Sequence, residues 1–156
     1  MENIFNMENL SDKVTNFIVA NNDIACNAAK EKAEELNYGT MLLTTSLKGE
    51  ARDMGCFLAD KALNYEKRDK NMVFISGGET TVTIHGDGKG GRNQEMVLST
   101  VKKISGSDLV FSSFATDGVD GMSDASGAIC DGYSLKRAMD LGMNPEGFLR
   151  NNDSYN

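Results

Sequence analysis

The sequence has little of several residue types that define whole classes of protein. It contains no Trp, one Pro and one His in 156 residues. A single Pro excludes a proline-rich linker. One His with three dispersed Cys residues leaves too few soft ligands for a typical zinc site. No apolar run approaches the ~18 residues that a helix needs to span a bilayer. We therefore expect neither a structural zinc protein nor a membrane-spanning one.

Basic residues are also scarce. Sixteen Lys and Arg residues face 23 Asp and Glu residues, a formal net charge of −7. A body this negative lacks the basic surface of a nucleic-acid binder or of a protein that binds anionic membranes. The odd number of cysteines (Cys26, Cys56 and Cys130) fits reduced thiols. Residues 1–5 carry an acid and no basic or long apolar run, so no signal peptide is predicted. We expect a cytoplasmic protein.

What is present is an ordinary globular composition, with 40% apolar residues and 16 Gly. The length favours one domain with a sizeable core. Apolar runs alternate with segments of helical spacing, which is typical of layered α/β domains. The predicted strands are 15–20, 40–45, 72–76, 80–85 and 109–115. Helices are predicted to begin near residues 21–23, near 49, at 92, at 135 and at 145, and the helix that begins at 92 is predicted to end at 105.

The sequence also predicts how two of the strands pair. The Gly77-Gly78 break between strands 72–76 and 80–85 indicates an antiparallel hairpin, so the sheet should be mixed. The Gly- and Asp-rich stretch 116–132 is predicted as a long loop. The expected fold class is a layered α/β/α domain with a mixed sheet, formed by residues 15–156 after a linking segment, 1–14.

The loop Gly86–Gly91 fits the Gly-x-Gly-x-x-Gly spacing between a strand and a helix. Glycines let a backbone approach phosphate, and the following helix start offers amides. The preceding strand alternates Thr with apolar residues, unlike the buried first strand of a dinucleotide-binding fold. Lys89 is followed by Gly, so this is no Walker loop. A flexible connection without a ligand is the alternative.

Arg92 opens the next predicted helix, where acidic residues are preferred because the helix dipole is positive there. Residues that break a local rule often mark functional sites. An Arg beside free backbone amides would clamp an anion. The alternative is a solvated Arg paired with Glu95 or Asp87.

A third candidate is the acidic loop after strand 109–115, which carries Asp117 and Asp120. Sheets of this class place ligand groups at the carboxyl ends of strands. Carboxylates there could hold Mg²⁺ or accept a proton from a hydroxyl. The alternative is that Asp and Gly only serve the geometry of a turn.

Taken in order, these motifs resemble the C-terminal (MOFRL) domain of the glycerate 2-kinase family. The likeness covers about residues 16–155, and its strength lies in the ordered set. The segments that carry it are 75–82, 88–95 and 116–121, with further likeness at 21–29, 48–52, 124–128 and 152–155.

The resemblance implies phosphoryl transfer from ATP to the 2-hydroxyl of D-glycerate, with Mg²⁺. Some relatives are labelled hydroxypyruvate reductases. An NAD(P)H-dependent reductase is the main alternative, based on the Gly-x-Gly-x-x-Gly spacing and on Asp117 beyond the next strand, and a non-catalytic ligand-binding module is another. Family members are longer and begin with a nucleotide-binding domain that supplies a catalytic lysine. We therefore expect a fragment, incomplete at its C-terminus, that requires that domain as its partner. Alone, it should be inactive and prone to form homo-oligomers.

The resemblance also implies roles for single residues. Arg92 matches the active-site arginine, a position suited to stabilising charge on a transferring phosphoryl group. Residues expected to contact substrate are Glu79, Lys89, Gly90, Gly91, Asn93 and Glu95. Asp117 and Asp120 are the candidates for metal or hydroxyl contacts.

Overall fold

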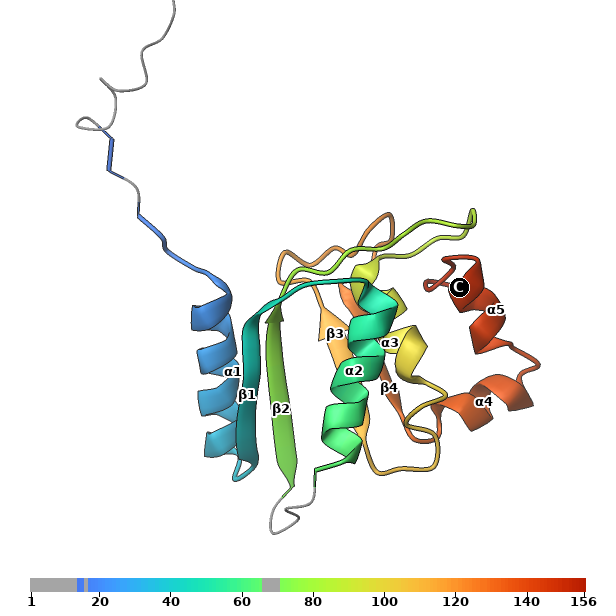
Figure 1. The fold of residues 1–156 in the computed structure, drawn as a ribbon, viewed down its shortest axis with the longest axis horizontal. Coiled ribbons are helices and arrows are strands. Elements are labelled where there is room, and N and C mark those ends of the chain that lie inside the picture. Colours follow the sequence, from blue (N-terminus) through green and yellow to red (C-terminus); the bar gives the residue numbers. More distant parts are fainter. Residues whose placement is uncertain (1–13, 16, 66–70) are drawn as a thin grey trace, which may run out of the picture.

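The computed structural model describes residues 14–15, 17–65 and 71–156. Helices and strands alternate through the first six elements, after which a strand and two helices follow (Figure 1). The parallel and antiparallel strand pairs among helices confirm the predicted α/β class. The elements are α1 (Asn22–Glu35), β1 (Gly39–Leu47), α2 (Ala51–Leu63), β2 (Met72–Gly78), α3 (Arg92–Thr100), β3 (Val110–Phe114), β4 (Gly127–Asp131), α4 (Ser134–Asp140) and α5 (Pro145–Arg150).

Helix α1 begins and ends where its local sequence dictates. The Asn21 side chain accepts a hydrogen bond of 2.9 Å from the Ile24 amide, which caps the helix at the start predicted near residues 21–23. At the other end Asn37 adopts a left-handed backbone (φ 64°), and the Tyr38 amide donates back to the Ala33 carbonyl. Asn tolerates this conformation better than most residues, so the helix ends here.

Strands β1 and β2 form a parallel pair that α2 connects. Parallel neighbours need such a crossover, because no tight turn can join them. Their register runs from Gly39 opposite Met72 to Leu47 opposite Gly78. Helix α1 packs against both strands, while Leu43 of β1 contacts the buried cluster of α2. The two helices lie on opposite sides of the pair (Figure 1), which gives the predicted α/β/α layering.

Strands β3 and β4 form a separate antiparallel pair. Cys130 of β4 is buried against Val97, Val101 and Ile104 of the α3 region, and Phe111 of β3 packs on the same cluster. Strand β4 lies inside the stretch 116–132 that the sequence predicts as a loop. Its apolar core is only three residues long, too short to stand out in a Gly- and Asp-rich setting.

Two predicted strands are wrong within the described residues. Residues 17–20 form no strand, and the Phe17, Ile18 and Val19 side chains are exposed. Apolar composition alone does not make a strand, because the backbone also needs a neighbour to pair with. The expected hairpin between 72–76 and 80–85 is also absent, since Thr81 makes only an isolated parallel bridge to Glu50.

The outer face of β3–β4 carries apolar side chains that no described part of the chain covers. Val110, Phe114 and Ile129 are 62%, 65% and 71% exposed, and they share the face that points away from α3. Exposed apolar patches of this kind drive association.

We expect the isolated chain to self-associate, as light scattering over a concentration series would show. Ile129→Ser should weaken the association, whereas Leu141→Ser, at another exposed apolar position, should not. A concentration-independent monomer would contradict this expectation.

No helix in the described ranges is both long and apolar enough to cross a membrane.

Candidate functional site

The start of α3 is held by a buried carboxylate. Asp120, 1% exposed, accepts hydrogen bonds from the Asn93 amide (3.1 Å) and the Gln94 amide (2.8 Å). The side chains of the same two residues donate to it at 3.0 and 3.1 Å. Four donors and the positive end of the helix offset the cost of burying this charge. Asp120 therefore fixes the loop that follows β3 to the first turn of α3.

This arrangement bears on two expectations. The amides of Asn93 and Gln94 are not free for a phosphate, because the Asp120 carboxylate already occupies them. The oxygens of Asp120 are likewise committed to protein donors, so they do not suit a Mg²⁺ ligand. Asp117 lies apart on the exposed part of the loop and accepts a 3.3 Å bond from the Val119 amide. No group of three potential metal-binding side chains occurs in the part of the chain that the structure covers.

Arg92 itself makes its ion pair outside this buried cluster. Its Nη2 lies 3.3 Å from Glu79 Oε1, and the two side chains are 39% and 75% exposed. The pair joins the first residue of α3 to the loop after β2. A surface ion pair contributes only ~0–1 kcal/mol. A stronger anionic ligand could therefore displace Glu79 from the Arg92 guanidinium at little cost.

The glycines of the loop before α3 have a packing role. A Cβ on Gly91 would collide with the Asp120 side chain, and one on Gly88 would meet Asn151 and Asp153. Close approach of two backbones, rather than approach to a ligand, is therefore sufficient to require Gly at these positions. Gly90, between them, lies against Ser154 in the same way. The spacing thus has a structural explanation independent of any dinucleotide.

Lys89 is held by the end of the described chain. Its Nζ lies 4.0 Å from the centre of the Tyr155 ring, a cation–π contact, and its carbonyl accepts from the Tyr155 amide. The Tyr155 hydroxyl donates a 2.5 Å bond to Asp124. This bond lowers the pKa of the Asp124 carboxyl, and the positive charge of Lys89 lowers it further. Residues 89, 124 and 155 thus form one exposed cluster.

The cluster yields a direct test. Tyr155→Phe removes the hydrogen bond that stabilises the ionised Asp124 carboxylate, so the Asp124 pKa should rise toward its ordinary value. An NMR titration of the Asp124 side chain measures this directly. The control Tyr133→Phe removes a hydroxyl from another exposed Tyr and should leave the Asp124 pKa where it was. An unchanged pKa in Tyr155→Phe would show that the two side chains do not meet in solution.

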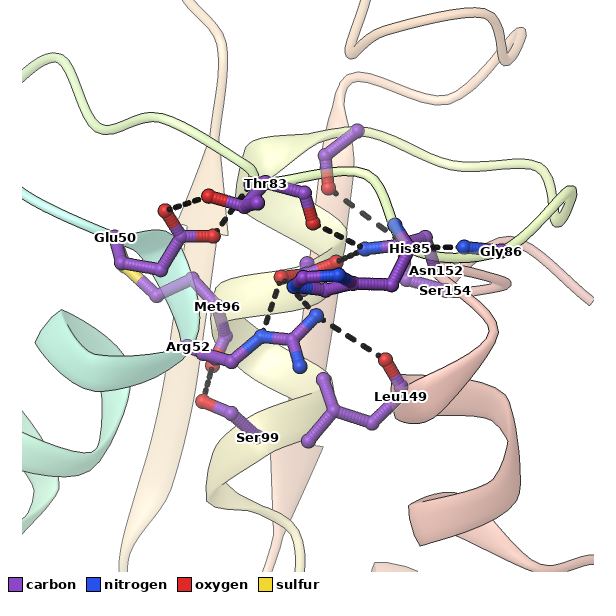
Figure 2. Close-up of polar contacts among 12 residues, drawn as sticks. Glu50, Arg52, Thr83, His85, Gly86, Met96, Ser99, Leu149, Asn152 and Ser154 are labelled. Carbon is purple, nitrogen blue, oxygen red and sulfur yellow. Dashed lines mark hydrogen bonds and ion pairs between the residues drawn. The ribbon is translucent and has the colours of Figure 1, made fainter.

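Glu95 is buried in an ion pair rather than exposed to a ligand. Its side chain is 2% exposed, and its Oε1 accepts from Arg52 Nε and Nη2, both at 2.9 Å. Arg52 is the second residue of α2, and it also donates to the Leu149 carbonyl of α5 at 3.2 Å. Figure 2 shows Arg52 between the three helices. Glu95, a predicted substrate contact, thus joins α3 to α2, and Arg52 extends the link to α5.

The loop before the glycines is tied to α2 as well (Figure 2). Glu50, just before that helix, accepts from the Thr83 amide at 2.6 Å and from its hydroxyl at 3.0 Å. These bonds, with the bridge at Thr81, replace the strand pairing that the sequence predicts for 80–85. The alternating segment is therefore largely exposed, and these polar contacts hold it in place of a neighbouring strand.

The structure divides the predicted site residues into two sets. Arg92, Glu79 and Lys89 keep side chains at the surface, whereas Asn93, Glu95 and Asp120 are engaged by other protein groups in the contacts that anchor the first turn of α3. Asn93 is fixed between Asp120 and the Ser113 hydroxyl, which donates to it at 2.6 Å. Residues not assigned to the site from the sequence are Arg52, Asp124, Asn152 and Tyr155, although each lies in a segment of the family resemblance.

Comparison with known proteins supplies the family. Residues 72–156, more than half of the chain, match the MOFRL family. The chain belongs to the MOFRL family. It is 41% identical to a glycerate 2-kinase of Pyrococcus horikoshii over 147 residues, which is 91% of this chain and 33% of that protein. A crystal structure of a glycerate kinase from Thermotoga maritima superposes with a TM-score of 0.84 at 39% identity, covering 89% of this chain and 35% of that one.

The same comparison bears on the alternative activity. A protein of Agrobacterium vitis that is provisionally named a hydroxypyruvate reductase is 38% identical over 147 residues, covering 88% of this chain and 33% of its own length. This MOFRL chain thus spans about a third of the length of the relatives it matches. Its elements correspond to one part of those larger proteins.

Proposed function

We propose that this chain forms the MOFRL part of a glycerate 2-kinase, which transfers a phosphoryl group from ATP to the 2-hydroxyl of D-glycerate. The observation that carries the proposal is Arg92, a half-exposed guanidinium at the start of α3 whose single ionic partner in the described structure, Glu79, is largely solvated. Kinship with glycerate kinases at about 40% identity supports the same activity.

Arg92 suits the role for chemical reasons. A guanidinium can donate two parallel hydrogen bonds to phosphate or carboxylate oxygens. Phosphoryl transfer is catalysed mainly by positioning and by stabilising charge on the equatorial oxygens. Lys89, Gly90 and Gly91 precede Arg92 directly, so a ligand on Arg92 would also meet this loop. In the proposal Asn93, Glu95 and Asp120 hold α3 in place and do not touch the substrate.

The cofactors follow from the reaction rather than from this chain. Here the full-length protein means this chain joined to the region that its relatives have in addition. In the proposal ATP is the phosphoryl donor, and the nucleotide-binding region of the full-length protein holds it. Mg²⁺ accompanies ATP in kinases generally. Asp117 and Asp120 do not fit a shared metal site, so we assign no metal ligand to this chain. Three free thiols, two of them buried, support a cytoplasmic location.

The rival is an NAD(P)H-dependent hydroxypyruvate reductase, for which the Gly-x-Gly-x-x-Gly spacing and Asp117 beyond the next strand are the sequence arguments. That spacing already follows from the packing of Gly88 and Gly91, so nothing in the loop requires a dinucleotide. A ligand-binding module without turnover is the third possibility.

One pair of assays separates the three. The full-length protein should form ADP from ATP only when D-glycerate is present, and it should not consume NADH with hydroxypyruvate. The 156-residue chain alone should show neither activity, because phosphoryl transfer requires both substrates to be positioned together. NADH consumption by the full-length protein would favour the reductase. Binding of glycerate without either turnover would favour the module.

A further inference from the structure

Asn152 occupies an unusual position for its residue type. It follows α5 with a left-handed backbone (φ 53°) and is 7% exposed. A left-handed Asn after a helix is a common way to end it. That role needs neither burial of the side chain nor hydrogen bonds from it, and Gly would serve better.

The side-chain amide of Asn152 uses its full bonding capacity (Figure 2). Its Oδ1 accepts from the His85 amide at 2.7 Å and the Gly86 amide at 3.1 Å. Its Nδ2 donates to the Thr83 carbonyl at 3.2 Å and to Glu95 Oε2 at 2.9 Å. Donors meet one end of the amide and acceptors the other, so only one orientation of the group satisfies the site.

These contacts fix the chain on both sides of Arg92. Residues 83–86 lie on the segment that leads through the glycine-rich loop into Arg92, and Glu95 is one turn beyond Arg92 on α3. The neighbours of Asn152 continue the attachment, since the Asn151 carbonyl accepts from the Gly88 amide and Asp153 accepts from the Lys89 amide. A single amide thus fixes the distance between the loop and the first turn of α3.

We propose that Asn152 is a positioning residue for Arg92: its side chain holds the loop and α3 in the geometry that the transferring group requires. The catalytic part of this inference rests on the proposed kinase function. The positioning part rests on the contacts alone. Arg52 completes the arrangement, because it holds the opposite oxygen of Glu95.

Asn152→Gly separates this role from helix termination. Glycine keeps the left-handed backbone without strain and removes all four side-chain bonds. The matched control is Asn37→Gly, which makes the same change at the other non-Gly residue with positive φ in the described chain. That residue follows α1, away from the loop.

The first measurement uses the 156-residue chain and amide hydrogen exchange followed by NMR. In Asn152→Gly the His85 and Gly86 amides should exchange at least about tenfold faster, while core amides such as Val97 and Ile104 report that the fold is intact. Asn37→Gly should leave the His85 and Gly86 rates unchanged. Unaltered exchange at these two amides in Asn152→Gly would overturn the positioning role.

The second measurement uses the full-length protein. Asn152→Gly should lower kcat about tenfold or more while KM for ATP is preserved, because Arg92 acts in the transition state; Asn37→Gly should keep wild-type kcat. Wild-type kcat in Asn152→Gly would overturn the catalytic part. If the wild-type protein itself fails to phosphorylate glycerate, the proposed function fails and the exchange result alone decides the positioning role.

A second variant covers the case in which Asn152→Gly does not fold. Asn152→Asp keeps an acceptor for the His85 and Gly86 amides and tolerates positive φ, but it sets a carboxylate against Glu95 in place of a donor. It should again lower kcat with KM for ATP preserved. Full turnover by this variant would contradict the proposal.

Discussion

Arg92→Lys in the full-length protein should lower kcat at least ~100-fold, because arginines that stabilise a transferring phosphoryl group contribute on the order of a thousandfold or more. A Lys keeps the charge but loses the two parallel hydrogen bonds of a guanidinium. The melting temperature should change little, since the Arg92 side chain is 39% exposed and its ion pair with Glu79 is solvated. Steady-state kinetics with ATP and D-glycerate, together with thermal unfolding, measure both quantities.

The control for this variant is Arg137→Lys. Arg137 also forms an exposed ion pair, with Asp131 at 2.8 Å, but lies on α4. The Arg137→Lys variant should retain the wild-type kcat. A raised KM for glycerate with kcat preserved in Arg92→Lys would reassign Arg92 to ground-state binding of the carboxylate. Wild-type values for both constants would end its assignment to the site.

The largest effect on stability is expected from Glu95→Ala. This change leaves the Arg52 guanidinium, whose side chain is 25% exposed, and the buried Asn152 amide without their shared partner. Removing one member of a buried ion pair costs roughly 3–5 kcal/mol. Because Arg52 retains some contact with water, the lower end, about 3 kcal/mol of the free energy of unfolding, is the expected loss. Urea denaturation of the 156-residue chain measures it.

Glu146→Ala provides the comparison, because it removes the carboxylate of an exposed pair with Lys102 (2.6 Å). Its cost should stay within about 1 kcal/mol. Equal, small effects from the two substitutions would mean that the Glu95–Arg52 pair is solvated in solution. A Glu95→Gln variant should fall between the wild type and Glu95→Ala, since the amide still offers Arg52 an acceptor.

The features that the sequence predicts well are set by neighbouring residues. The helix starts near residues 21–23, at Pro145 and at Arg92 each depend on a few adjacent residues. Amphipathic spacing located α1 and α2 for the same reason. In each case the physical cause lies within one or two turns of the chain.

The features that it predicts poorly depend on distant partners. From the sequence, Asp120 is predicted as a turn residue or a metal ligand, and only the structure shows that it accepts from the Gln94 amide. Glu95 is predicted to contact substrate, and only the structure shows its ion pair with Arg52. The predictions for β4 and for residues 80–85 fail for a similar reason, because a strand forms only where another strand pairs with it. Thr83 finds Glu50 and Asn152 rather than a strand.

The polar contacts around Glu95 also bear on the order of folding. The bond from Arg52 to Leu149 joins residues 97 positions apart, and the bond from Asn152 to Thr83 joins residues 69 positions apart. Contacts of such long range form only after loop-closure entropy has been offset. On the ribosome, where N-terminal parts fold first, α1, β1, α2 and β2 emerge before the last of these partners. The loop that leads to Arg92 thus reaches its final path only after residue 152 has been made and has docked, so this loop folds after the elements on which it rests.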